Sequence, residues 1–144
     1  LVEIGRVPSL AFACAIPVGS LATAILVVNN LRDRVTDLAA GKRTLAVRYG
    51  RAFALGQYRA LLVASYLTPL GLALSGHTGP EVLLSWLSLP LALKTERAVT
   101  ATEGRALNPL LAATAKLLAV FGVLFALGLC LRGVLSHFGW ASRP

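Results

Sequence analysis

The chain has 144 residues, of which 56% are hydrophobic and only 14% are charged. A mean hydropathy of +0.73 lies outside the usual balance of soluble globular domains and indicates a membrane protein. The net charge of +8 does not indicate nucleic-acid binding, because the basic residues form short blocks between apolar runs rather than one polar face.

The first expected spanning helix covers residues 8–31. No residue from 7 to 31 is charged, and at about 1.5 Å per residue such a run crosses a hydrocarbon core of about 30 Å. Pro17 and Gly19 lie inside it, and membrane helices tolerate such residues. We therefore expect one span with a kink near Pro17.

The next two expected spans are less regular. An uncharged stretch over 60–80 predicts a helix at about 53–75. The following apolar run, 82–93, is too short to cross a bilayer alone. The third span must therefore include flanking residues, and we place it at 80–97.

The fourth expected span covers 107–131. Asn108 and Pro109 suit its start, since proline is favourable in the first turn of a helix. With it, the expected fold class is all-α: a polytopic transmembrane helical bundle. Arg59 and Lys116 each lie several residues inside an apolar run, where an ionisable group either has a function or extends to the membrane surface.

The basic residues favour one orientation. Most of them follow the first span or lie between the third and fourth, so both of these loops are expected on the cytoplasmic side. The two chain ends and the turn around His77 then lie on the outer side. The second basic loop is expected to be solvated, with a role as a substrate gate as the alternative. Its charged residues are Lys94, Glu96, Arg97, Glu103 and Arg105.

The stretch NNLRDRVTDLAAGKRT, residues 29–44, contains the only two aspartates of the chain. Asn29, Asp33 and Asp37 are four residues apart, so on a continuing helix they project from one face. Oxygen-only ligands of this kind suit Mg²⁺, which bridges carboxylates to substrate phosphates. The spacing thus predicts a magnesium site.

A structural interpretation of the same residues is also open. Asp33 and Asp37 could simply pair with basic neighbours at the membrane surface, namely Arg32, Arg34 or Arg43.

The turn GKRT, residues 41–44, favours the metal interpretation. It places Lys42 and Arg43 directly after the acidic residues, where a diphosphate would need cations beside a metal. A P-loop is excluded, because Thr36 stands at the required earlier glycine and Arg43 at the position of the Ser or Thr.

The longer stretch NNLRDRVTDLAAGKRTLAVRYG resembles the second aspartate-rich motif of the UbiA-type intramembrane prenyltransferases. The similarity extends to IPVGSLATAILVVNN before it and EGRALNPLLAATAKL after it, and so covers most of the chain. It is strongest to the branch that prenylates 1,4-dihydroxy-2-naphthoate in menaquinone biosynthesis.

The resemblance implies a fold of about nine spans with two aspartate-rich motifs facing each other across a central cavity. Residues 1–144 would then be the C-terminal part of a single domain, with about four spans. The first motif and about five helices would lie upstream, in a missing N-terminal half, and this chain would be inactive alone.

The resemblance also implies a reaction: Mg²⁺-dependent transfer of a polyprenyl group from polyprenyl diphosphate to the naphthoate, with loss of CO₂, giving demethylmenaquinol. Asp33 and Asp37 would bind Mg²⁺ with support from Asn29, and Lys42 and Arg43 would contact the diphosphate. Further substrate contacts are expected from Asn30, Arg32, Asn108 and Lys116. The enzyme would lie in the lipid bilayer of a bacterial inner or plasma membrane, with its active site facing the cytoplasm.

Two other functions are open. The acceptor could be another aromatic compound such as 4-hydroxybenzoate, or the chain could be half of a transporter or channel with a cation site at its acidic face. Asp33 and Asp37 follow the end of the first span instead of lying at mid-membrane, which favours metal chemistry at the surface. Cys14 and Cys130 are far apart with no nearby histidine, so we expect neither a disulfide nor a metal site from them.

Overall fold

The structure is a computed structural model that describes residues 9–137, with side chains described over 10–131. The expected first span begins at residue 8, just outside this range. All elements within the described residues are helical, which confirms the all-α fold class. In chain order they are α1 (Ser9–Arg32), α2 (Arg34–Ala39), α3 (Leu45–Leu74), the 3₁₀ helix η1 (Pro80–Ser88), α4 (Leu89–Ala101), the 3₁₀ helix η2 (Gly104–Leu107) and α5 (Asn108–His137).

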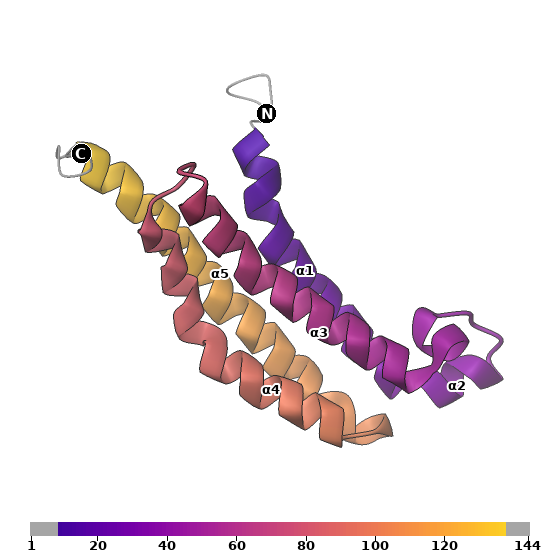
Figure 1. Cartoon of the computed structure of the whole chain (residues 1–144). Coiled ribbons are helices and arrows are strands. Elements are labelled where there is room, and N and C mark those ends of the chain that lie inside the picture. Colours follow the sequence, from indigo (N-terminus) through magenta and orange to yellow (C-terminus); the bar gives the residue numbers. More distant parts are fainter. Residues whose placement is uncertain (1–8, 138–144) are drawn as a thin grey trace.

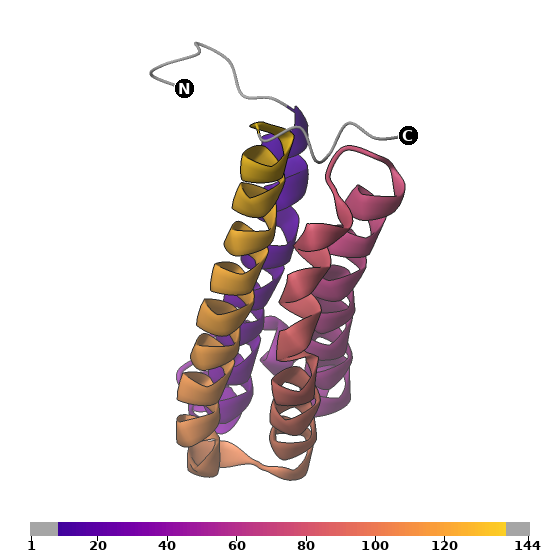
Figure 2. The same ribbon diagram turned by 90° about the vertical axis from the view of Figure 1, so that its left-hand side faces the viewer.

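Four antiparallel rods form the bundle: α1, α3, η1 with α4, and α5 (Figure 1). The start of α1, the turn after α3 and the end of α5 lie together at one end of the bundle, and α2 and η2 lie at the other (Figure 2). This is the up-and-down arrangement that short turns between successive apolar runs favour.

The second rod begins earlier than expected. Thr44 caps α3 by accepting a hydrogen bond at its Oγ1 from the Val47 backbone N–H at 3.3 Å. Gly50 then has φ +82° and ψ 178°, which is not helical, so α3 consists of a first piece over 45–49 and a main rod over 51–74. The main rod agrees with the helix expected over 53–75.

The third rod is longer than its apolar run. The nine residues of η1 continue into the thirteen of α4. At about 2.0 Å per residue for a 3₁₀ helix and 1.5 Å for an α-helix, the rod is about 37 Å long, enough for a hydrocarbon core of about 30 Å. Lys94, Glu96 and Arg97 lie on α4, which agrees with the helix placed at 80–97, so their assignment to a loop is wrong.

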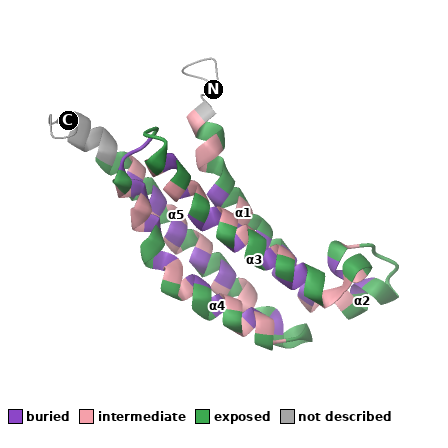
Figure 3. Cartoon of the chain, in the orientation of Figure 1, coloured by how far each residue is buried: buried purple, intermediate pink, exposed green. Residues whose placement is uncertain are grey.

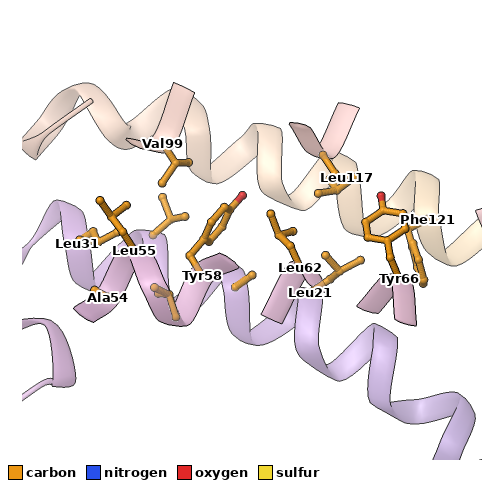
Figure 4. Close-up of a cluster of buried hydrophobic side chains, with 14 of the residues drawn as sticks. Leu21, Leu31, Ala54, Leu55, Tyr58, Leu62, Tyr66, Val99, Leu117 and Phe121 are labelled. Atoms are coloured by element: carbon orange, nitrogen blue, oxygen red, sulfur yellow. The ribbon is translucent and has the colours of Figure 1, made fainter. Parts of the chain in front are cut away.

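The core runs along the inside of all four rods. Tyr58, Leu62 and Tyr66 of α3 point toward Leu117 and Phe121 of α5 (Figure 4). The Tyr66 and Phe121 rings meet edge to face, with centroids 5.4 Å apart. Both tyrosine hydroxyls form buried hydrogen bonds, that of Tyr66 to the Ser88 hydroxyl at 2.6 Å and that of Tyr58 to the Thr114 hydroxyl at 3.4 Å.

The outside of the bundle is apolar. Exposed residues cover the outer faces of the rods (Figure 3), and many of them are large hydrophobic side chains, such as Phe12, Leu26, Leu67, Val123 and Leu127. Two helical stretches, Leu10–Arg32 and Gly104–Leu131, are long and apolar enough to cross a membrane. An apolar exterior of this kind suits contact with lipid or with other helices. That the other two rods also cross the membrane stays a prediction.

Candidate active site

The aspartate segment, residues 29–44, starts in the last turn of α1. The expectation that one continuing helix carries Asn29, Asp33 and Asp37 is wrong, because α1 ends at Arg32 and Asp33 is a turn residue with φ −94° and ψ 4°. The interruption is small. The Asp33 N–H still donates to the Asn29 carbonyl at 3.0 Å, and the Asp37 N–H to the Asp33 carbonyl at 2.8 Å. Asn29 and Asp33 share one partner, Arg32, and Asp37 has another, Lys42.

The Arg32 guanidinium is the centre of the first part of the site. Its Nε and one Nη donate to the two carboxylate oxygens of Asp33 at 2.8 and 2.6 Å. The same Nη donates to Asn29 Oδ1 at 2.8 Å, and the other Nη donates to Asn108 Oδ1 at 3.0 Å. Arg32 therefore joins the last turn of α1 to the first residue of α5, and three of the expected site residues meet around it.

The second part of the site is built by the end of α2. The Gly41 N–H donates to the Leu38 carbonyl and the Lys42 N–H to the Asp37 carbonyl, which is the hydrogen-bond pattern of a Schellman motif. Gly41 has φ +71°, a conformation that costs other L-residues free energy. The turn carries Lys42 back to Asp37, and its Nζ lies 2.9 Å from Asp37 Oδ1.

The charged groups of the two parts, Arg32 with Asp33 and Lys42 with Asp37, lie close enough for the charges of one part to shift pKa values in the other. Hydrogen bonds from Arg32 hold the pKa of Asp33 below its ordinary value against an opposing effect of desolvation, and the charges of Arg32 and Lys42 lower this pKa further. The hydrogen bond to Asp37 raises the pKa of Lys42. Asp33 is therefore negatively charged, and Lys42 positively charged, at neutral pH.

The structural interpretation of the aspartates is partly confirmed. Asp33 pairs with Arg32, one of the three partners considered. Asp37 pairs with Lys42 instead, and its side chain is only 9% exposed.

Other expected site residues do not join these contacts. Within residues 10–131, the side chains of Asn30, Arg43 and Lys116 form no hydrogen bond or ion pair. Arg43 and Lys116 are exposed, and Asn30 is half-buried.

An apolar groove leads from the Arg32 network along the bundle. It lies between α1 and α5, has a volume of about 560 Å³, and has one polar residue, Asn29. Its apolar lining consists of Ala22, Ile25, Leu26, Leu111, Ala112 and Ala115. Since Asn29 also accepts from Arg32, the groove ends at the charged part of the site.

The donor chemistry of the site suits a hard cation. Asp33 and Asp37 supply carboxylates and Asn29 an amide oxygen, the ligand types that Mg²⁺ takes together with water and substrate phosphates. Within the described residues no three His, Cys, Asp or Glu side chains cluster into a metal site. The two carboxylates and the amide oxygen are thus of the donor types that fit a hard cation such as Mg²⁺.

One residue that supports the site was not expected from the sequence. Arg51 directly follows the break at Gly50, and its guanidinium donates to the backbone carbonyls of Thr100 at 2.6 Å and Thr102 at 3.3 Å. Its Nε also lies 3.0 Å from Glu103. Arg51 thereby holds the α4–η2 connection, and so the start of α5, beside the aspartate segment. Its only signal in the sequence is its position after a glycine in a basic loop.

The fold and the site together define an all-α membrane protein whose charged, oxygen-rich site lies at the end of an apolar groove. The chain belongs to the UbiA prenyltransferase family, whose family model matches residues 3–108. Members of this family are integral membrane proteins.

Three relatives carry more specific names. The chain is 35% identical over 138 residues to 1,4-dihydroxy-2-naphthoate octaprenyltransferase of Mycobacterium leprae, covering 92% of this chain and 44% of that protein. It is 38% identical over 117 residues to the Escherichia coli protein of the same name, covering 78% and 37%. It is 33% identical over 130 residues to mouse UbiA prenyltransferase domain-containing protein 1, covering 90% and 37%. The chain thus spans about two fifths of the length of these relatives, and no solved structure matches it significantly.

Proposed function

We propose that this chain is the C-terminal part of an enzyme that transfers a polyprenyl group from polyprenyl diphosphate to 1,4-dihydroxy-2-naphthoate. The main support is the junction at Asn29, where an apolar groove meets a cluster of cations and carboxylates. A polyprenyl diphosphate has the same two-part chemistry. Its hydrocarbon tail suits the groove, and its diphosphate suits the Arg32 and Lys42 end. The names of the Mycobacterium leprae and Escherichia coli relatives support this acceptor.

The aspartates would act through a divalent metal, on which UbiA prenyltransferases generally depend. We assign Mg²⁺ to Asp33 and Asp37, with Asn29 as an additional oxygen donor. Bound there, Mg²⁺ would withdraw charge from the diphosphate and make it a better leaving group. In the transfer, the prenyl carbon–oxygen bond breaks, a carbon–carbon bond to the ring forms, and the ring carboxyl leaves as CO₂.

The other residues of the site would bind and orient the substrate. Lys42 and Arg43 contact the diphosphate, and Arg32 is positioned to do the same, since its guanidinium is fixed from three sides by Asn29, Asp33 and Asn108. A fixed guanidinium loses little conformational entropy when it binds an oxyanion. Asn30 and Lys116 stay proposed substrate contacts that depend on parts of the enzyme outside this chain.

The proposed location follows from the charge distribution. The basic residues around 32–51 and 94–105 support a location of the α2 end of the bundle, and with it the active site, on the cytoplasmic side of a bacterial inner membrane. The upstream part of the enzyme would supply a first aspartate-rich motif and cover the α1–α5 groove.

The test uses the whole enzyme in membranes supplied with a polyprenyl diphosphate, Mg²⁺ and either 1,4-dihydroxy-2-naphthoate or 4-hydroxybenzoate. We expect demethylmenaquinone from the naphthoate only, and none after chelation of the metal. The variant Asp33→Asn should lower the rate by about 100-fold or more, since changes even to the outer partners of metal ligands cost about 10–100-fold.

Glu103→Gln is the matched control, because this side chain lies at the same end of the bundle, is 73% exposed, and as glutamine keeps an oxygen that can accept from Arg51. Its rate should stay close to that of the wild type. Product from 4-hydroxybenzoate alone would overturn the acceptor, and near-normal turnover of Asp33→Asn would overturn the metal assignment.

A further inference from the structure

A second groove lies between α3 and α4 and shares no residue with the proposed active site. Its volume is about 470 Å³, and α3 lines it with Leu62, Val63 and Tyr66. Ala92 and Leu93 of α4 complete its apolar lining, and Arg59 and Glu96 contribute its charged residues. Since α3 and α4 are antiparallel, the charged pair lies at the end of the groove nearer to α2.

The charged pair is well defined. Arg59 Nε donates to Glu96 Oε1 at 2.7 Å, and one Nη donates to Thr100 Oγ1 at 3.3 Å. Thr100 in turn donates to Glu96 Oε1 at 2.9 Å. The Arg59 side chain nevertheless remains 54% exposed, whereas that of Glu96 is 20% exposed. The guanidinium is thus held in place on one side and accessible on the other.

The end of the groove carries an excess of positive charge. Arg97 follows Glu96 on α4 and is exposed. Together with Arg59 it places two cations beside one carboxylate. Basic pockets between membrane helices on the cytoplasmic side bind the headgroups of acidic lipids. An ionisable residue inside an apolar helix is costly there and is expected to have a function.

We propose that the α3–α4 groove is a binding site for an anionic phospholipid of the surrounding bilayer. The lipid phosphate contacts Arg59, with Arg97 nearby, and an acyl chain lies against Val63 and Leu93. Prenyl diphosphate is a poorer occupant, because Glu96 is the one carboxylate that lines this groove and no second carboxylate lies there to hold a metal with it.

The experiment measures lipid binding directly. The whole protein is reconstituted in phosphatidylcholine vesicles that contain a trace of spin-labelled phosphatidylglycerol or spin-labelled phosphatidylcholine, and the immobilised fraction is read by electron paramagnetic resonance. We expect phosphatidylglycerol to be preferred. Arg59→Gln should lower its relative affinity about fivefold, which corresponds to about 1 kcal/mol per cation near the membrane surface.

Further variants separate charge from folding. Arg59→Lys should keep the preference, and Arg48→Gln, which removes an exposed cation from the same helix, should not change it. Glu96→Gln should strengthen the preference, because it removes the one negative charge. Val63→Trp should exclude both labelled lipids, since Val63 is an exposed lining residue with room for a larger side chain.

Three results would overturn the proposal. One is equal immobilisation of the two lipids by the wild-type protein, as expected if upstream helices cover the groove. Another is a preference unchanged by both Arg59→Gln and Val63→Trp. The last is displacement of the labelled lipid by a polyprenyl diphosphate at stoichiometric amounts, which would assign the groove to the substrate.

Discussion

At the scale of single residues, Arg32 does most to assemble the site. One side chain satisfies a carboxylate and two amide oxygens and connects residues that are 76 positions apart in the chain. Hydrogen bonds from a charged donor are stronger than those between neutral groups. Small changes around Arg32 should therefore affect substrate binding.

The two asparagines Asn30 and Asn108 provide a test of this network. Asn108→Ala removes the Arg32 contact to α5, so the guanidinium loses its orientation, and we expect the KM for polyprenyl diphosphate to rise about five- to tenfold, about 1 kcal/mol or slightly more. Asn30→Ala is the comparison, because Asn30 is a proposed substrate contact outside the Arg32 network and its side chain forms no hydrogen bond within residues 10–131. Steady-state kinetics of the whole enzyme measures both. A larger effect of Asn30→Ala would show that Asn30, and not Asn108, contacts the substrate.

Gly41 provides a second test at this scale. Gly41→Ala forces an L-residue into φ +71°, which should destabilise the protein by about 1–2 kcal/mol and misplace Lys42. Gly56→Ala is the control, since Gly56 lies on the exposed side of α3 with no atom near the added methyl group. There alanine should stabilise by up to about 1 kcal/mol. Thermal unfolding in detergent compares the two, and equal shifts would contradict the role of the Gly41 turn.

At the scale of helices, apolar runs in the sequence predicted the helices well, whereas the polar contacts between residues could not be predicted from the sequence. Uninterrupted hydrophobic runs predicted α1, the main rod of α3 and α5, because such runs have few alternatives to a membrane helix. The break at Asp33 and the Lys42–Asp37 contact depend on local hydrogen bonds that the DxxxD spacing does not reveal. The Arg59–Glu96 and Arg32–Asn108 contacts depend on which faces of distant helices meet, and that information is absent from a local pattern.

Packing between helices gives the third prediction. A methyl group on Gly128 of α5 would lie 2.3 Å from the Glu81 carbonyl oxygen of η1, so Gly128→Ala should separate the two rods and cost about 1–3 kcal/mol. Gly122→Ala on the same helix is the control, because no atom lies within 4 Å of its added methyl group. Thermal unfolding again provides the comparison. A Gly128→Ala protein as stable as Gly122→Ala would show that η1 is not packed this closely on α5.

At the scale of the whole molecule, the topology can be tested by labelling. In a background with Cys14→Ala and Cys130→Ser, a cysteine at Ala40 should react from the cytoplasmic side and one at His77 from the outer side. Both positions are exposed, whereas the neighbouring Thr78 is buried and unsuitable. A membrane-impermeant maleimide applied to intact cells or to inverted vesicles distinguishes the sides. Labelling of both positions from one side would remove α3 from the set of spans.

The two aspartates and the open groove of this chain predict which groups the rest of the enzyme must supply. Among the described residues the only aspartates are Asp33 and Asp37, each already paired with one cation, and the α1–α5 groove is open along one side. The positive charges of Arg32 and Lys42 offset the negative charges of the two carboxylates, so this chain alone holds a divalent ion weakly. Because the groove is open, the prenyl tail also needs groups from elsewhere.

Expressed alone, residues 1–144 should therefore insert into membranes but form no product. Co-expression with the upstream half should restore Mg²⁺-dependent formation of demethylmenaquinone, and Asp33→Asn in this chain should abolish the restored activity. The matched control, co-expression with Glu103→Gln, should support the same activity as the wild-type chain. Product formed by residues 1–144 alone would mean that one aspartate segment suffices for the reaction and that the open groove needs no covering helices.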